Sequence, residues 1–430
     1  MSEVAKAGRS CTGASFFVPL NDSAVIQNDC EIARATHRER SVRDAGTASE
    51  RWPAPEDSSA KACQALVRLR RWLLDDAYPV WARDGWDPVH GGFQERLTPA
   101  GPVLGESRRA CVQVRQIYCF ARAGELGWTG DARRLLTAGL DHFLKRYRRS
   151  DGLFRTLVAP DGHVVDDRAL LEDQACALLA FAEAHRFWGG SSDLLAQART
   201  LLGAIEAQFR QPDDGFVSGL GGRALLSRPH LLLLEAALAW RAISEESCWH
   251  RLAEELTRLA LDRLIDPQCG VLHEHFAGGS AALPGGAGRL IEPGHQFEWA
   301  WLLMRRGSDA RARRAAARLL EIGETHGLRN GVAVNALLPD MTVQDSRARL
   351  WAQAGRLKAL ARGALLGEAR CWPLAGQAAE VLQRFLDSGA RGLWHVRRKP
   401  GGEFIREPSP GSSFQAIVCA IGELAAALPA

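Results

Sequence analysis

The chain has 430 residues, of which 46% are hydrophobic and 24% are charged, and its formal net charge is only +4. This composition is typical of a globular protein with a large core, and the length suffices for one large domain or for two to three ordinary ones. Arginines gather on helix-like stretches, which favours solvated helix faces and argues against a nucleic-acid partner.

The ten cysteines are spread along the chain without any CxxC pair. This spacing favours free thiols in a reducing compartment over disulfides or a zinc site, so we expect a cytoplasmic protein. The sequence has no run of 18 apolar residues and no secretory signal pattern, so we expect no membrane association. His273-Glu274-His275 suggests a metal, but alternating residues on a short extended segment are more typical of a solvent-facing strand. We therefore expect neither a metal nor a cofactor.

Residues 1–60 differ in character from the rest of the chain. They are rich in Ser, Ala and charged residues, and they show little periodicity apart from the apolar run 16–20. Such composition is typical of segments that bury too little apolar surface to fold. We therefore predict a disordered N-terminal extension over 1–60 and a single domain over 61–430.

A helical period begins near Ala62, where leucines recur at 66, 69, 73 and 74. From there the chain alternates between two kinds of predicted helix. One kind is amphipathic and suits an outer layer, at 62–83, 131–149, 191–210, 248–266, 309–326 and 372–388. The other kind is apolar on most faces, as buried helices are, at 107–127, 168–188, 224–243, 293–306, 346–366 and 412–427.

A glycine followed by an apolar residue recurs six times in a turn-like setting, at intervals of about 60 residues. The six pairs are Gly92-Phe93, Gly152-Leu153, Gly215-Phe216, Gly270-Val271, Gly331-Val332 and Gly392-Leu393. This regularity indicates a repeated unit of two helices and a link. The segments 91–97 and 153–158, each followed by a Pro/Gly turn, predict short β-hairpins as links.

Six buried helices alternating with six amphipathic ones predict an all-α fold, an (α/α)6 barrel of twelve helices with short β-hairpin links at one end. Closure into a ring removes the exposed ends of an open solenoid. Each link leads into the start of an inner helix, so all six inner-helix N-termini should lie at one mouth of the barrel. Free N–H groups and helix dipoles there favour anionic or polyhydroxyl ligands.

The start of the fourth inner helix carries the clearest candidate chemistry. His295 and Glu298 are three residues apart and share one face of the first turn. A histidine beside a carboxylate is a plausible acid/base unit, because its pKa lies near neutral pH. A buried histidine that is simply hydrogen-bonded to the glutamate is the alternative interpretation.

The string Glu-Pro-Gly-His-Gln-Phe-Glu-Trp-Ala-Trp at 292–301 resembles the signature of the N-acylglucosamine 2-epimerase superfamily. That group includes cellobiose 2-epimerases and mannose or sulfoquinovose aldose–ketose isomerases. The resemblance covers about residues 62–427 and recurs in order in all six repeats. Its other matches are Gly91-Gly92-Phe93, Gln113-Val-Arg115, Asp173-Gln174-Ala175, Arg228-Pro-His230 with Glu235-Ala236, Leu350-Trp351-Ala-Gln353 and Gly392-Leu393-Trp394.

The resemblance implies an (α/α)6 barrel and proton transfer at carbon 2 of an open-chain sugar through an enediolate. In this family two histidines act as acid and base, and an arginine stabilises the oxyanion. Carried over by position, His295 is a catalytic histidine, Glu298 its carboxylate neighbour and Arg115 the polarising cation. The implied substrate contacts are His230, Trp301, Trp351, Trp394, Asp173 and Gln415. The implied partner is a small-molecule sugar, and the family often forms homodimers.

Three positions depart from the family pattern. Gln415 stands where the family usually has its second catalytic histidine, Leu232 replaces another histidine, and Gly355 replaces a glutamate. Glutamine cannot exchange a proton near neutral pH. The second proton would then come from His230, or from His273 or His275.

Two further functions stay open at this point. One is a catalytically impaired sugar-binding protein on the same scaffold, which the substitutions favour. The other is a glycoside hydrolase or lyase using two carboxylates from among Asp173, Glu292 and Glu298.

Overall fold

Twelve helical segments alternate between an inner and an outer layer in the computed structural model, which describes residues 55–211, 215–220, 225–276, 290–307 and 309–428. The inner helices are α4 (Ala110–Ala123), α6 (Leu171–Phe187), α8 (Ser227–Arg241), α10 (Pro293–Arg305), α12 (Leu350–Leu365) and α14 (Phe414–Ala427). Nearly every residue of these helices is buried, as their apolar sequences predict.

The outer layer starts with α2 (Pro55–Arg71), which continues through a π-helical turn η1 (Trp72–Ala77) into α3 (Tyr78–Arg83). The first outer helix therefore begins at Pro55, ahead of the domain start expected at residue 61. The remaining outer helices are α5 (Ala132–Tyr147), α7 (Ser192–Phe209), α9 (Ser247–Leu259) extended by η2 (Ala260–Leu264), α11 (Ala310–His326) and α13 (Cys371–Leu386). Residues 1–54, most of the predicted extension, lie outside the described part of the chain.

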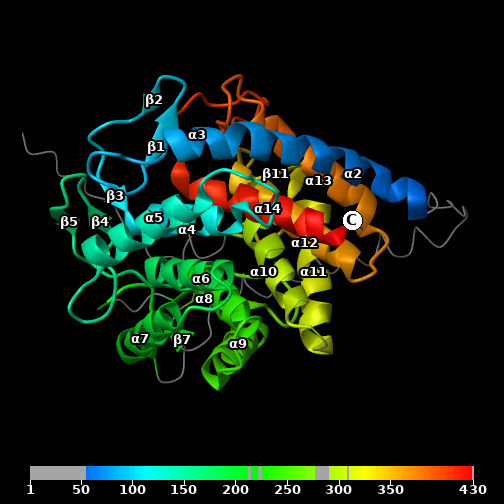
Figure 1. Cartoon of the computed structure of the whole chain (residues 1–430). Coiled ribbons are helices and arrows are strands. Elements are labelled where there is room, and N and C mark those ends of the chain that lie inside the picture. Colours follow the sequence, from blue (N-terminus) through cyan, green and yellow to red (C-terminus); the bar gives the residue numbers. More distant parts are fainter. Residues whose placement is uncertain (1–54, 212–214, 221–224, 277–289, 308, 429–430) are drawn as a thin grey trace, which may run out of the picture. The chain divides into compact units, whose positions relative to one another are not determined.

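The inner helices form a closed ring. Each contacts the next in chain order, and α14 returns to α4. Each outer helix packs on the inner helix of its own unit, while α13 packs against α2 across the closure. Figure 1 shows α14 lying inside the outer helices α2 and α13. The predicted (α/α)6 toroid is thus confirmed, and within the described residues every helix falls short of the length and apolar character that a membrane span needs.

Short strands join neighbouring units at the end where the inner helices begin. Two three-stranded sheets are β16 (Ser409–Pro410) with β1 (Arg96–Thr98) and β2 (Gly101–Pro102), and β3 (Arg108–Arg109) with β4 (Leu157–Val158) and β5 (Val164–Asp166). The two-stranded ladders are β6 (Arg210–Gln211) with β7 (Gly215–Phe216), β8 (Leu225–Leu226) with β9 (His275–Phe276), β10 (Leu328–Arg329) with β11 (Val332–Ala333), β12 (Ala336–Leu337) with β13 (Val343–Asp345), and β14 (Ala348–Arg349) with β15 (Arg397–Arg398).

The residues just before each inner helix pair with the link of another unit. The pairs are β3 with β4, Leu170 with Gly219, β8 with β9, Ile291 with Leu337, β14 with β15, and β16 with β1. This circle of backbone bridges holds the six inner-helix starts at one end of the barrel. The six turn glycines all have positive φ, between 68° and 86°, which explains the repeat seen in the sequence.

Candidate active site at the barrel mouth

Three of the outer helices begin differently from the inner helices. Asp131, Ser191 and Asp309 cap α5, α7 and α11 by accepting hydrogen bonds from backbone N–H groups. The inner helices α4, α6, α8, α10 and α12 instead begin from an extended residue without a side-chain cap among the described residues. The first N–H groups of α4, α6, α8 and α12 donate to carbonyls of neighbouring links, at 2.8–3.1 Å. The positive ends of the inner-helix dipoles lie at the mouth, where they favour negative charge.

A glutamine clamp ties the first turn of four inner helices to the preceding link. The amide of each glutamine accepts from the backbone N–H and donates to the carbonyl of one link residue, at 2.7–3.0 Å. The clamps are Gln113 to Phe93, Gln174 to Phe154, Gln296 to Leu272 and Gln353 to Ala333. These side chains orient the helix starts, and their amide groups are occupied by hydrogen bonds to the backbone.

His230 takes the clamp position in α8. Its Nε2 accepts from the Phe216 N–H at 3.0 Å, and its Nδ1 lies 2.7 Å from the Leu226 carbonyl. Burial lowers the pKa of His230, which favours the neutral ring that this pair of contacts requires. Both nitrogens are thus occupied by backbone groups, so neither is available to a substrate or for proton donation.

His295 lies one position earlier in its helix than the clamp and is only 5% exposed. Its Nδ1 lies 2.6 Å from Oε2 of Glu274, which also accepts from the Ser227 hydroxyl at 2.7 Å. Its ring packs against Trp351, with centroids 4.9 Å apart. Burial alone would lower the pKa of His295, but the negative charge of Glu274 outweighs burial and raises it.

The other nitrogen of His295, Nε2, is buried and has no hydrogen-bond partner among the described residues. An orphaned polar atom of this kind calls for an explanation, because burying it unpaired costs free energy. Since Glu274 holds Nδ1, the free Nε2 is the atom available to a ligand at the mouth. Sequence reasoning missed Glu274 and placed it on a solvent-facing strand.

Glu298 does not contact His295 through a hydrogen bond or ion pair in this structure. Its Oε2 instead accepts from Nζ of Lys358 at 2.6 Å, and both side chains are buried. Gly355 makes room for this pair, since a Cβ there would lie 2.9 Å from Oε1 of Glu298. The glutamate that the family usually has at this position is therefore replaced by a glycine that admits a buried ion pair. Neither Lys358 nor its pairing was predicted.

Arg115 lies at the start of α4 in a network of charges. It is 3.4 Å from Oε1 of Glu172 and donates to the Ser412 carbonyl at 3.4 Å, while its Nε is buried without a partner among the described residues. Arg228 also pairs with Glu172, at 2.6 and 3.1 Å. Burial would raise the pKa of Glu172, but Arg228 and Arg115 lower it to about 2. The carboxylate therefore stays ionised and holds both guanidinium groups.

Asp173 is 4% exposed and accepts from the Thr156 hydroxyl at 2.6 Å. Burial raises its pKa to about 7. Gln415 is also buried, in the first turn of α14, and Leu232 is 9% exposed in α8.

Two of the predicted sugar-stacking tryptophans lie in the core. Trp394 packs against both Trp81 and Phe414, with ring centroids 5.1 and 5.4 Å away, and donates to the Ser413 hydroxyl. Trp301 is fully buried, with Nζ of Lys358 3.9 Å from its ring centroid. Trp351 alone of the three is partly exposed, beside His295.

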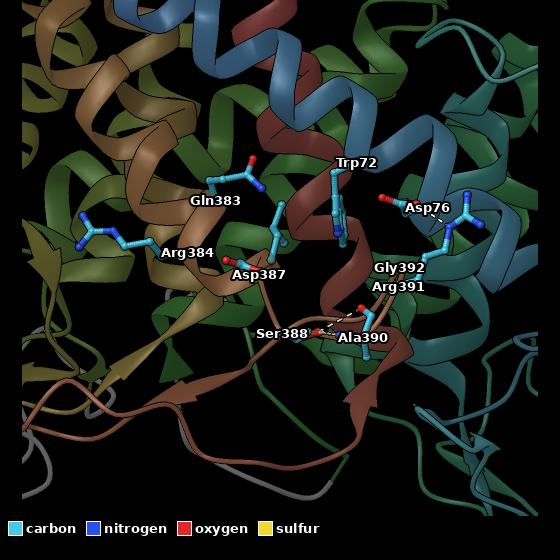
Figure 2. A pocket seen from close by; sticks show the side chains of 11 residues that line it. Trp72, Asp76, Gln383, Arg384, Asp387, Ser388, Ala390, Arg391 and Gly392 are labelled. Carbon is cyan, nitrogen blue, oxygen red and sulfur yellow. Dashed lines mark hydrogen bonds and ion pairs between the residues drawn. The ribbon is translucent and has the colours of Figure 1, made fainter.

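The hollows lined by described residues include three that differ in their place on the barrel. One of about 360 Å³ lies between η1 and the end of α13, where Asp76 pairs with Arg391, and none of the predicted site residues lines it (Figure 2). One of about 500 Å³ lies at the mouth between Glu95, Arg109 and Pro410. A third, of about 180 Å³, is enclosed by the far halves of the inner helices. No cluster of three or more His, Cys, Asp or Glu suited to a metal occurs among the described residues.

Comparison with known proteins identifies the family of this chain. Residues 91–420 match the family model of N-acylglucosamine 2-epimerase (GlcNAc 2-epimerase). A mannose-6-phosphate isomerase of Rhizobium meliloti (strain 1021) is 42% identical over 369 residues, covering 83% of this chain and 95% of that protein.

Solved structures similar to this one include the cellobiose 2-epimerase of Spirochaeta thermophila DSM 6192, with a TM-score of 0.74, 20% identity, and coverage of 85% of this chain and 98% of the other. A D-mannose isomerase has the same TM-score at 17% identity, with coverage of 88% and 100%. At this identity they show the shared fold. The family model matches most of the chain. The chain therefore belongs to the N-acylglucosamine 2-epimerase family, a family of sugar epimerases and isomerases.

Proposed function

We propose that the protein is an aldose–ketose isomerase that moves a proton at carbon 2 of an open-chain sugar, with a phosphorylated aldose such as mannose 6-phosphate as its substrate. The observation that carries this proposal is His295, whose Nδ1 is held by Glu274 while its buried Nε2 has no partner among the described residues. A general base needs one free nitrogen and a fixed ring orientation, and this arrangement supplies both.

In the proposed reaction, neutral His295 takes the proton from carbon 2. The C–H electron pair forms the C1=C2 double bond, and the carbonyl electrons move to O1. Arg115 stabilises the resulting negative charge, because its side chain is mostly buried and its Nε has no hydrogen-bond partner among the described residues. Return of the proton to carbon 1 gives the ketose, whereas return to the opposite face of carbon 2 would give the 2-epimer.

A phosphorylated substrate is supported by three observations. The curated relative of 42% identity is named a mannose-6-phosphate isomerase. Five inner helices begin at the mouth without a side-chain cap, and the positive ends of their dipoles favour anions there. Arg349, the residue before α12, is exposed there. Trp351, beside His295, is the best placed of the tryptophans to contact the sugar.

The test is to incubate the purified full chain with mannose 6-phosphate in deuterated buffer and to follow ketose formation, deuterium at carbon 1 of the ketose and deuterium at carbon 2 of the aldose by NMR. Mannose, N-acetylmannosamine and cellobiose serve as parallel substrates. We expect ketose formation fastest with the phosphorylated sugar. No exchange with any of these sugars, together with a rise in melting temperature on adding them, would instead support a sugar-binding protein, the alternative that Gln415 and Leu232 favour.

A further inference from the structure

Asp173 occupies in the second repeat the position that His295 occupies in the fourth. Each residue directly precedes a clamp glutamine, Gln174 in α6 and Gln296 in α10. Each is also held by a residue of its link, with Thr156 to Asp173 and Glu274 to His295 both at 2.6 Å.

The holding residues match in register as well. Thr156 lies two residues after Phe154, which Gln174 clamps, and Glu274 lies two residues after Leu272, which Gln296 clamps. Because helix, clamp and link are repeated, Asp173 and His295 leave their helices in corresponding directions. The helices α6 and α10 are separated by α8 in the ring, so the two side chains approach the mouth from different sides.

The other clamped helices carry no titratable group at this register. The five residues that precede the clamps are Val112, Asp173, Pro229, His295 and Ala352. An aspartate and a histidine are thus the only two that exchange protons, and both are at least 95% buried. Gln415, where the family usually has its second histidine, has no such capacity.

From this placement we propose that Asp173 is the second proton-transfer group of the site, carrying the proton from O2 to O1 of the sugar while His295 carries the proton from carbon 2 to carbon 1. This inference rests on the proposed isomerase function. The protonated carboxyl donates to O1 as negative charge develops there, and the resulting carboxylate takes the proton from O2 as the new carbonyl forms at carbon 2. Asp173 ends the cycle protonated, so the step needs no other reactant.

The surroundings of Asp173 fit this role. Burial raises its pKa to about 7, so both protonation states are populated at neutral pH. The neighbouring charge of Glu172 raises the pKa further, while Thr156, Arg115 and Arg109 lower it. The other titratable groups that interact with it are the buried Cys111, Cys176 and Tyr147.

The experiment compares wild type, Asp173→Asn, Thr156→Val and His295→Asn in ketose formation across pH. We expect Asp173→Asn to lower kcat by about 10²-fold or more and to remove one limb of the pH profile, with an unchanged melting temperature. Thr156→Val keeps the carboxyl but removes the hydrogen bond that lowers its pKa, so the same limb should move to higher pH.

Wild-type kinetics in Asp173→Asn, or an unmoved pH profile in Thr156→Val, would overturn the inference while leaving the isomerase proposal intact. If wild type itself produces no ketose and no exchange at carbon 2 with any sugar tested, the proposed function fails, and the role of Asp173 fails with it. The His295→Asn variant measures how much of the rate depends on proton transfer at carbon 2. Failure of the Asp173 proposal can therefore be told apart from failure of the isomerase proposal.

Discussion

The starts of α8 and α10 each carry a buried histidine, yet the two side chains have different hydrogen-bond partners. His230 stands at the clamp position, and both of its nitrogens contact backbone groups. His295 stands one residue before the clamp position of its helix, and among the described residues only one of its nitrogens has a hydrogen-bond partner, which is Glu274. A difference of one residue in the helix therefore separates a histidine that holds the backbone of the mouth from a histidine that can contact a ligand.

The largest effect is expected from His295→Asn. Removal of the general base should lower kcat for ketose formation by about 10³-fold with little change in melting temperature. Steady-state kinetics and thermal unfolding of the same preparation measure both quantities. An active His295→Asn enzyme would break the comparison, because the unpartnered nitrogen would then have no role.

Lys358→Met should chiefly affect stability. It leaves the buried carboxylate of Glu298 without its partner, and breaking a buried pair in this way costs about 3–5 kcal/mol in the free energy of unfolding. The double variant Lys358→Met, Glu298→Leu should recover much of that loss. Denaturant unfolding of the single and double variants tests this, and equal stability of the single variant and wild type would contradict the pairing.

Glu274→Gln should change the pH dependence of the reaction. The charge of Glu274 raises the pKa of His295, and the active form of His295 is neutral, so wild-type activity rises with pH through that raised pKa. Without the charge the rise should occur at lower pH. Glu298→Gln is the matched control and should leave this limb in place. A shift of this limb in Glu298→Gln but not in Glu274→Gln would show that Glu298, and not Glu274, is the partner of His295.

The smallest effect is expected from His230→Gln, which restores the clamp residue of α4, α6, α10 and α12. Because glutamine can make the same two backbone contacts, we expect kcat to be unchanged and the free energy of unfolding to change by less than about 1 kcal/mol. A large loss of activity in a stable His230→Gln protein would show that His230 takes part in the reaction.

Much of the fold could be predicted from the sequence because its signals are local. Apolar periodicity marked all twelve helical segments to within several residues, and each recurrent glycine marked a turn that needs positive φ. The family resemblance then predicted site roles for His295, Arg115, Asp173 and Trp351. The same reasoning placed Trp394 and Trp301 at the sugar, although both are packed in the core.

The sequence by itself determined the repeat, the alternation of buried and amphipathic helices, and which residues stand at inner-helix starts, since these depend on spacing along the chain. Only the tertiary structure decided which carboxylate meets which cation. Glu274 contacts His295 although it lies 21 residues earlier in the chain, because the link between them is folded back. Lys358, on the next helix of the ring, pairs with Glu298, which is 60 residues away in sequence. Such pairings depend on packing between elements, and a spacing of three residues on one helix could not reveal them.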